Sequence, residues 1–237
     1  MNSPMQAPEL REVRVPCGNT WLYGDLAVPV NFSGLVLFAH GSGSGRHSAR
    51  NRQVAQTLQR AGMATLLFDL LTAQEEEVDS HTREHRFDIA LLTRRMQDAT
   101  VWAMAQPGLQ QTSIGYFGAS TGSAAAIIAA ARLGHSISAI VSRGGRPDLV
   151  GPVALAAVTA PTLLLVGGAD PEVIAFNQHA LQHLQSIKRL DIIPGATHLF
   201  EERGALEQVA GLAASWFTAH FAHKENAERR DHTEHSS

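Results

Sequence analysis

Residues 113–122 read Ser-Ile-Gly-Tyr-Phe-Gly-Ala-Ser-Thr-Gly, and the structure expected for the whole chain depends on this stretch. Its first half is a strand-like apolar run, its second half matches Gly-x-Ser-x-Gly, and an alanine-rich helical pattern follows directly. A serine between a strand and a helix lies in a tight turn, where flanking glycines avoid clashes between a Cβ and neighbouring backbone. The stretch therefore predicts that Ser120 is an exposed nucleophile near a helix amino terminus, which favours negative charge.

Short apolar runs and longer helical patterns alternate on both sides of this stretch. The runs predict buried strands at residues 35–39, 63–69, 112–117, 137–142, 161–166 and 188–193, preceded by an antiparallel pair at 9–16 and 21–28. Strands that alternate with helices form βαβ crossovers. We therefore expect an α/β domain with a mostly parallel sheet of about eight strands, helices on both faces and no large cap domain.

The ends and one long connection fall outside this alternation. Residues 9–223 are predicted to form the domain, whereas residues 224–237 are polar, lack apolar periodicity and predict a disordered tail. Leu71–Arg86 is too long for a tight connection after a strand. Its polar composition leaves two interpretations open, a lid over the site or a solvated loop.

Two further loops supply the partners that a serine nucleophile needs. His198 follows the last predicted strand and Asp170 follows the strand before it. Because the carboxyl ends of parallel strands meet at one edge of a sheet, both loops lie on the same edge as Ser120. We predict that His198 is the general base and Asp170 the acid that orients it, in the chain order Ser, Asp, His.

The loop from His40 to Gly45 is rich in glycine and follows another strand. Its spacing does not match a phosphate-binding or dinucleotide-binding loop. We expect the backbone N–H of Ser42 to stabilise an oxyanion together with the N–H of Thr121; Gly43 is the alternative to Ser42. His40 is expected to support this loop.

The chain resembles the α/β-hydrolase superfamily and, within it, the dienelactone-hydrolase-like group. The resemblance rests on the His-Gly loop, the Gly-x-Ser-x-Gly turn and the loops of Asp170 and His198. The resemblance runs from about Val13 to Phe221. It implies cleavage of an ester or related acyl bond in a small molecule, without a cofactor, by a carboxylesterase-like or dienelactone-hydrolase-like enzyme. Dienelactone hydrolase itself uses a cysteine nucleophile, so Ser120 is a departure, and dienelactone is not carried over as substrate. Acyl transfer or perhydrolysis by the same triad, and a non-catalytic ligand-binding module, stay open.

Arg143 and Arg146 follow a buried strand and therefore also belong to this edge. Two arginines beside an active site can hold a carboxylate or phosphate of the substrate. The alternative is that they pair with Asp148 or with residues 75–77, which are all glutamate.

Composition limits the other partners. With 237 residues and a net charge of −3, the chain has no basic field for nucleic acid, and no apolar run is long enough to span a membrane. The single cysteine, Cys17, allows neither an intrachain disulfide nor a cysteine metal cluster, which fits the cytoplasm. Whether the protein forms a homodimer is left open.

Histidine pairs with i, i+4 spacing occur twice, at His81 and His85 and at His179 and His183. This spacing suits two metal ligands on one helix face, but neither pair has an obvious third ligand. We therefore predict no metal.

Overall fold

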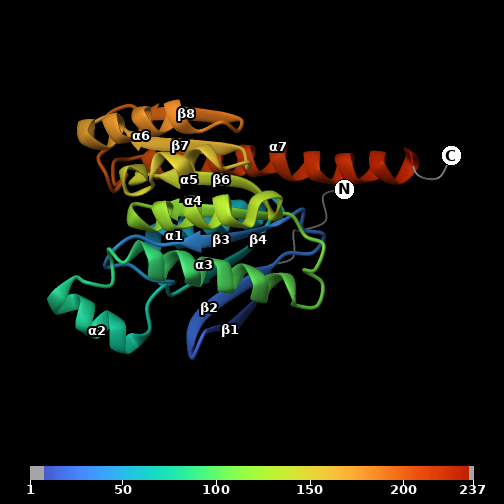
Figure 1. The fold of residues 1–237 in the computed structure, drawn as a ribbon, viewed down its shortest axis with the longest axis horizontal. Coiled ribbons are helices and arrows are strands. Elements are labelled where there is room, and N and C mark those ends of the chain that lie inside the picture. Colours follow the sequence, from blue (N-terminus) through green and yellow to red (C-terminus); the bar gives the residue numbers. More distant parts are fainter. Residues whose placement is uncertain (1–7, 235–237) are drawn as a thin grey trace.

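The centre of the molecule is an eight-stranded sheet with the order β1-β2-β4-β3-β5-β6-β7-β8 (Figure 1). In this computed structural model residues 8–234 are described, with side chains up to Phe221. The strands are β1 (Glu9–Cys17), β2 (Thr20–Val28), β3 (Leu35–Ala39), β4 (Ala64–Phe68), β5 (Ile114–Ala119), β6 (Ile137–Arg143), β7 (Thr162–Gly167) and β8 (Lys188–Ile193). β2 pairs antiparallel with β1 and β4, and the other pairs are parallel. The predicted mostly parallel sheet with an antiparallel amino-terminal pair is confirmed.

The central strands are buried along their whole length. Every residue of β3, β4, β5 and β7 is buried, as expected for continuous apolar runs covered on both faces. Their parallel pairing aligns the carboxyl ends, so the loops after β3, β5, β6, β7 and β8 leave from one edge. The predicted site residues lie in these loops or at the element ends next to them.

Helices cover both faces of the sheet, each over its own apolar cluster (Figure 1). One face carries α3 (Ile89–Met104), α4 (Thr121–Leu133), α5 (Pro152–Ala156) and α6 (Pro171–His183). The other carries α1 (Ala49–Arg60) and α7 (Ala205–Glu234). Two 3-10 turns, Gly134–Ser136 and Pro147–Leu149, precede β6 and α5.

The segment Leu71–Arg86 contains a helix, α2 (Ala73–Thr82), which stands out from the sheet edge in Figure 1. Thr72 and Glu75 form a reciprocal capping box: Thr72 Oγ1 accepts from the N–H of Glu75, and Glu75 Oε2 accepts from the N–H of Thr72. The carboxylate of Glu75 also pairs with buried Arg95 of α3 at 2.6 Å. The segment is therefore an anchored helix rather than a plain loop, and its movement as a lid stays a prediction.

The far end of α2 is held by a buried carboxylate. Asp79 accepts hydrogen bonds from the main-chain N–H groups of His85 and Arg86, at 2.9 and 2.8 Å. Arg86 Nε pairs with the same carboxylate at 2.6 Å. These contacts connect α2 to the start of α3.

Two element ends differ from the sequence prediction. β5 continues to Ala119 and β6 to Arg143, so Ser120 follows its strand directly and Arg143 is the last residue of β6. The backbone of α7 is helical to Glu234, through most of the predicted tail 224–237, and the last three residues lie outside the described part. The division into a domain and a disordered tail stays a prediction. Within residues 8–234, no helix is both long and apolar enough to cross a membrane.

Candidate active site

Ser120 occupies a strained turn between β5 and α4. Its φ of 48° and ψ of −124° lie in a region that non-glycine residues rarely adopt. A Cβ on Gly118 would collide with Ser123, and one on Gly122 would collide with the main-chain oxygens of Ala39 and His40. The glycines of Gly-x-Ser-x-Gly are thus required by close backbone approach, as the sequence predicts.

Both main-chain polar groups of Ser120, its N–H and its carbonyl, are hydrogen-bonded. Its N–H donates to the carbonyl of Arg143 at 3.2 Å. Its carbonyl accepts from Ser123 N–H at 3.1 Å, from Ser123 Oγ at 2.8 Å and from Arg146 N–H at 3.2 Å. These hydrogen bonds hold the strained conformation. Sequence reasoning missed Ser123, because no motif signals a hydrogen bond that exists only once the turn has formed.

His198 and Asp170 form the second part of the arrangement. His198 Nδ1 lies 2.7 Å from Asp170 Oδ2, and the two side chains are 39% and 16% exposed. Asp170 stands at the amino terminus of α6, before Pro171, but its side chain makes no capping hydrogen bond and is directed to His198 instead. The carboxylate therefore fixes the imidazole with Nδ1 as the donor and Nε2 available to accept a proton.

Glycine contacts show how closely the loops approach one another. A Cβ added to Gly144, in the loop after β6, would lie 3.4 Å from His198 Cε1. A Cβ added to Gly41, in the loop after β3, would lie 3.0 Å from Ser120 Cβ. The structure thus brings the loops of all three predicted triad residues to one edge of the sheet.

Ser42 and Thr121, the two predicted oxyanion donors, lie side by side. Their hydroxyl oxygens are 3.0 Å apart. Thr121 is the first residue of α4, so its N–H belongs to the helix terminus that has no intrahelical acceptor. Gly43 has a positive φ of 65°, which a glycine adopts without strain. The two residues thus lie beside the Ser120 turn, and the role of their N–H groups as oxyanion donors stays a prediction.

His40 is buried beneath the same loop. Its Nε2 accepts from the N–H of Leu70 at 2.8 Å, and its Nδ1 lies 3.0 Å from the carbonyl of Gly41. Burial lowers the pKa of His40, although the Gly41 carbonyl and Asp69 act in the opposite direction. A neutral ring that donates to Gly41 and accepts from Leu70 supports the loop, in line with the role predicted for His40.

Arg143 and Arg146 have different surroundings. Arg146 forms a two-pronged ion pair with Asp148, at 2.8 and 2.7 Å, and its guanidinium lies over the ring of Phe176. Arg143 is only 8% exposed, and its Nε and Nη1 are buried without a hydrogen-bond partner among the described residues. Burial, and to a smaller degree the nearby Arg50, lowers the pKa of Arg143 to about 10, so the side chain remains charged at neutral pH.

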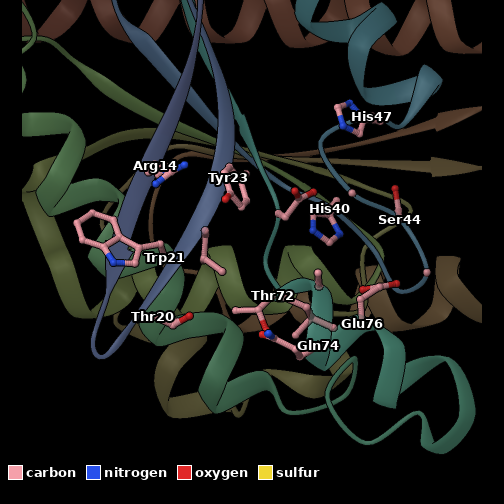
Figure 2. Close-up of a pocket in the computed structure, with 16 residues that line it drawn as sticks. Arg14, Thr20, Trp21, Tyr23, His40, Ser44, His47, Thr72, Gln74 and Glu76 are labelled. Carbon is pink, nitrogen blue, oxygen red and sulfur yellow. The ribbon is translucent and has the colours of Figure 1, made fainter.

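A groove of about 730 Å³ lies on the other side of the His40–Gly45 loop. Figure 2 shows the β1–β2 hairpin at the left, the start of α2 below, and the loop residues Ser44 and His47 at the right. Ser120, Asp170 and His198 are not part of its lining. The groove lies next to β2, β4 and β3 rather than β5 to β8. Sequence reasoning missed it, because its walls come from segments that meet only in the folded chain.

The remaining candidates do not join the site. Cys17 is buried at the end of β1, and burial is the main cause that raises its pKa to about 12, which keeps the thiol unreactive. His179 Nε2 lies 3.2 Å from His183 Nε2 on the exposed side of α6. Within the part of the chain that the structure describes, no group of three or more potential metal ligands occurs.

The sheet order and the strand-to-helix turn that carries Ser120 define a protein of the α/β-hydrolase fold. The chain belongs to the dienelactone hydrolase family, whose match spans residues 26–230. The crystal structure of a dienelactone hydrolase from Anabaena variabilis is 56% identical in sequence, covers 91% of this chain and 99% of its own, and superimposes with a TM-score of 0.89. The expected superfamily and group are both confirmed.

Two other similarities extend this comparison. A Mycobacterium tuberculosis protein, provisionally named a phosphoribosyl transferase, is 53% identical over 215 residues, which are 90% of this chain but 47% of the relative. The chain therefore spans about half the length of that relative. Est1E from Butyrivibrio proteoclasticus shares the fold at 17% identity, with a TM-score of 0.75, over 89% of this chain and 99% of its own.

Proposed function

We propose that this protein is a serine hydrolase that cleaves an ester or related acyl bond of a small molecule through an acyl-enzyme. The observation that carries the proposal is the 2.7 Å hydrogen bond between His198 Nδ1 and Asp170. This hydrogen bond leaves His198 Nε2 able to act as a base. His198 lies at the same sheet edge as the strained Ser120 turn. Membership of the dienelactone hydrolase family supports a hydrolytic reaction.

In this proposal Ser120 Oγ attacks the carbonyl carbon while His198 Nε2 accepts the hydroxyl proton. The N–H groups of Ser42 and Thr121 stabilise the oxyanion, with Gly43 as the alternative to Ser42. The tetrahedral adduct collapses, and His198 returns the proton to the leaving alcohol. His198 then removes a proton from water, which attacks the acyl-enzyme, releases the acid and restores Ser120.

The same groups support acyl transfer or perhydrolysis when another nucleophile replaces water in the second step. A non-catalytic module that keeps this fold for ligand binding has no need of an aspartate-oriented histidine. The transferase name of the mycobacterial relative does not lead to a further proposal, because this chain matches about half of that protein. A cytoplasmic location and a homodimer stay predictions.

For the substrate we propose an anionic group, held by Arg143. A buried guanidinium with two unpartnered nitrogens is costly, and a carboxylate or phosphate on the substrate would satisfy them. In the parallel pairing of β5 and β6, Arg143 lies opposite Ala119, the residue before Ser120. The backbone of Arg143 therefore lies next to the Ser120 turn. Arg146 is a weaker candidate, because Asp148 already occupies its guanidinium.

The test of the proposed reaction is the hydrolysis of short-chain 4-nitrophenyl esters by the native protein, Ser120→Ala and Ser33→Ala. Ser33 is exposed, and its hydroxyl bonds the carbonyl of Gly62, so it is a matched control. We expect Ser120→Ala to lose about a thousandfold or more in kcat and Ser33→Ala to lose nothing. Equal rates for native protein and Ser120→Ala would contradict the proposal and favour the binding module.

A further inference from the structure

The loop that follows β3, residues 40–46, is rich in glycine and contains no helix or strand. Three of its seven residues are glycine, and Gly43 has a positive φ of 65°. Figure 2 shows its course past His40 and Ser44. Glycine loses more conformational freedom on folding than any other residue, so such a loop keeps one shape only where other groups hold it.

The two residues that follow β4, Asp69 and Leu70, hold both ends of this loop. The N–H of Leu70 donates to Nε2 of His40, the first loop residue, at 2.8 Å. The carboxylate of Asp69 accepts from the main-chain N–H of Arg46, the last loop residue, at 2.8 Å. A Cβ on Gly45 would lie 2.7 Å from Asp69 Oδ1, so the loop backbone packs directly against this carboxylate. Adjacent residues at the end of one strand therefore set the distance between the two ends of the loop.

The side chain of Arg46 strengthens the second of these anchors. It is only 12% exposed, and its Nε lies 3.3 Å from Asp69 Oδ2. Its Nη1 donates to Glu12 at 3.0 Å and to Asp25 at 2.9 Å, so the same guanidinium connects the loop to β1 and β2. The guanidinium also lies 5.6 Å from the ring centroid of Tyr23 on β2. A largely buried cation with three carboxylate partners is held in one orientation, because each lost contact would leave a desolvated charge.

We propose that Arg46 and Asp69 are positioning residues of the candidate active site. The inference rests on the proposed function, in which the N–H of Ser42, or of Gly43, stabilises the oxyanion. Both donors lie between the two anchored ends of the loop. A main-chain donor stabilises the developing charge only while it is held within about 0.5 Å of its productive position. Arg46 and Asp69 thus act through the loop and take no part in the bond-making steps.

The experiment compares Arg46→Gln, Asp69→Asn and the double variant with the native protein, and Arg14→Gln is the control. Arg14 is an exposed arginine of β1 whose guanidinium lies 5.4 Å from the centroid of the same Tyr23 ring. For 4-nitrophenyl acetate we expect kcat to fall about tenfold or more in both single variants with KM nearly unchanged, because the oxyanion forms only in the transition state. The double variant should lose little more than the worse single variant, since both changes release the same anchor. Arg14→Gln should keep native kcat.

Two further readouts separate positioning from a general loss of stability. Amide hydrogen exchange of residues 40–48, followed by mass spectrometry, should be faster in Arg46→Gln and Asp69→Asn and native in Arg14→Gln. Affinity for a trifluoromethyl ketone, which forms a tetrahedral adduct with an activated serine, should fall in parallel with kcat. Arg46→Lys keeps the charge but not the two-directional contacts, so both effects should be smaller. If Arg46→Gln does not fold, Arg46→Lys provides the same test.

Native kcat in Arg46→Gln and Asp69→Asn, a fall confined to the urea midpoint, or native exchange of the loop would overturn the proposal. A native protein that does not hydrolyse esters would contradict the proposed function instead. The exchange rates would then still decide whether Arg46 and Asp69 hold the loop.

Discussion

The hydroxyl of Ser123 donates to the main-chain carbonyl of Ser120 at 2.8 Å and accepts from the N–H of Arg146 at 3.1 Å. One side chain thus connects the Ser120 turn to the loop after β6. A strained backbone persists only where its surroundings hold it in place. Ser123 is therefore a positioning residue for Ser120.

Ser123→Ala removes this connection. The Ser120 carbonyl then accepts two hydrogen bonds, from the N–H groups of residue 123 and Arg146. We expect about a tenfold lower kcat with KM nearly unchanged, and a loss of about 1–2 kcal/mol in the free energy of unfolding. Ester kinetics and urea denaturation measure these effects, with Ser33→Ala as the control. A stability loss without any change in kcat would show that Ser123 has a structural role only.

Asp170→Asn tests the orientation of His198. An amide can donate where the carboxylate accepts, so the imidazole loses the partner that fixes its tautomer. We expect kcat for ester hydrolysis to fall by about a thousandfold or more, with the fold preserved. Asp191→Asn, in β8, where the carboxylate pairs with exposed Arg189, should keep native kcat. Similar kcat values for the two variants would argue against Asp170 as the orienting acid.

Arg143→Gln tests the anionic substrate. The comparison uses 4-nitrophenyl esters of glutarate and of valerate, which have the same chain length and differ in the terminal carboxylate. We expect kcat/KM for the glutarate ester to fall about tenfold or more and that for the valerate ester to change little. Arg60→Gln, at the exposed far end of α1, is the control. Equal losses on both esters would assign Arg143 a structural role.

The pairing of Glu75 with Arg95 predicts a pH dependence of stability. Burial raises the pKa of Glu75, but Arg95 and the capping bonds of Thr72 outweigh it and lower the pKa from 4.5 to about 2. Because the folded pKa is below the unfolded one, the stabilisation is full above about pH 4.5 and is lost as the pH falls toward about 2.

Glu75→Gln should therefore cost about 1–2 kcal/mol at pH 7, allowing for solvent screening of a partly exposed pair, and progressively less below about pH 4.5. Urea denaturation between about pH 7 and pH 3 measures the difference. Exposed Glu77→Gln should show almost none. A cost that stays constant with pH would mean that Glu75 acts through packing and not through its charge.

The sheet and the loops of Ser120, Asp170 and His198 could be predicted because short-range signals specify them. Apolar runs define the strands, and parallel pairing aligns their carboxyl ends. The α2 helix was not predicted, because its polar surface has no apolar periodicity, although the Thr72-x-x-Glu75 capping pattern marks its start. Its stability comes instead from ion pairs with Arg95 and Arg86, which sequence alone does not reveal.

The surroundings of single side chains were less predictable. Arg143 and Arg146 look equivalent in sequence, yet Arg143 is buried over the ring of Phe200 with two nitrogens that lack a hydrogen-bond partner among the described residues, and Arg146 is bound to Asp148. The difference arises because Arg143 is the last residue of β6, whereas Arg146 directly precedes the 3-10 turn that contains Asp148. The hydrogen bonds of Ser123 form only once the Ser120 turn has folded. The groove beside the His40–Gly45 loop is lined by segments that are distant in sequence.

The most direct test of the central claim is labelling of the folded native protein with a fluorophosphonate probe, followed by mass spectrometric location of the adduct. An activated serine reacts with this probe, whereas an ordinary serine hydroxyl does not. The account predicts one adduct, on Ser120, and none in Ser120→Ala. A folded native protein that remains unlabelled, or carries its adduct on another residue, would contradict it.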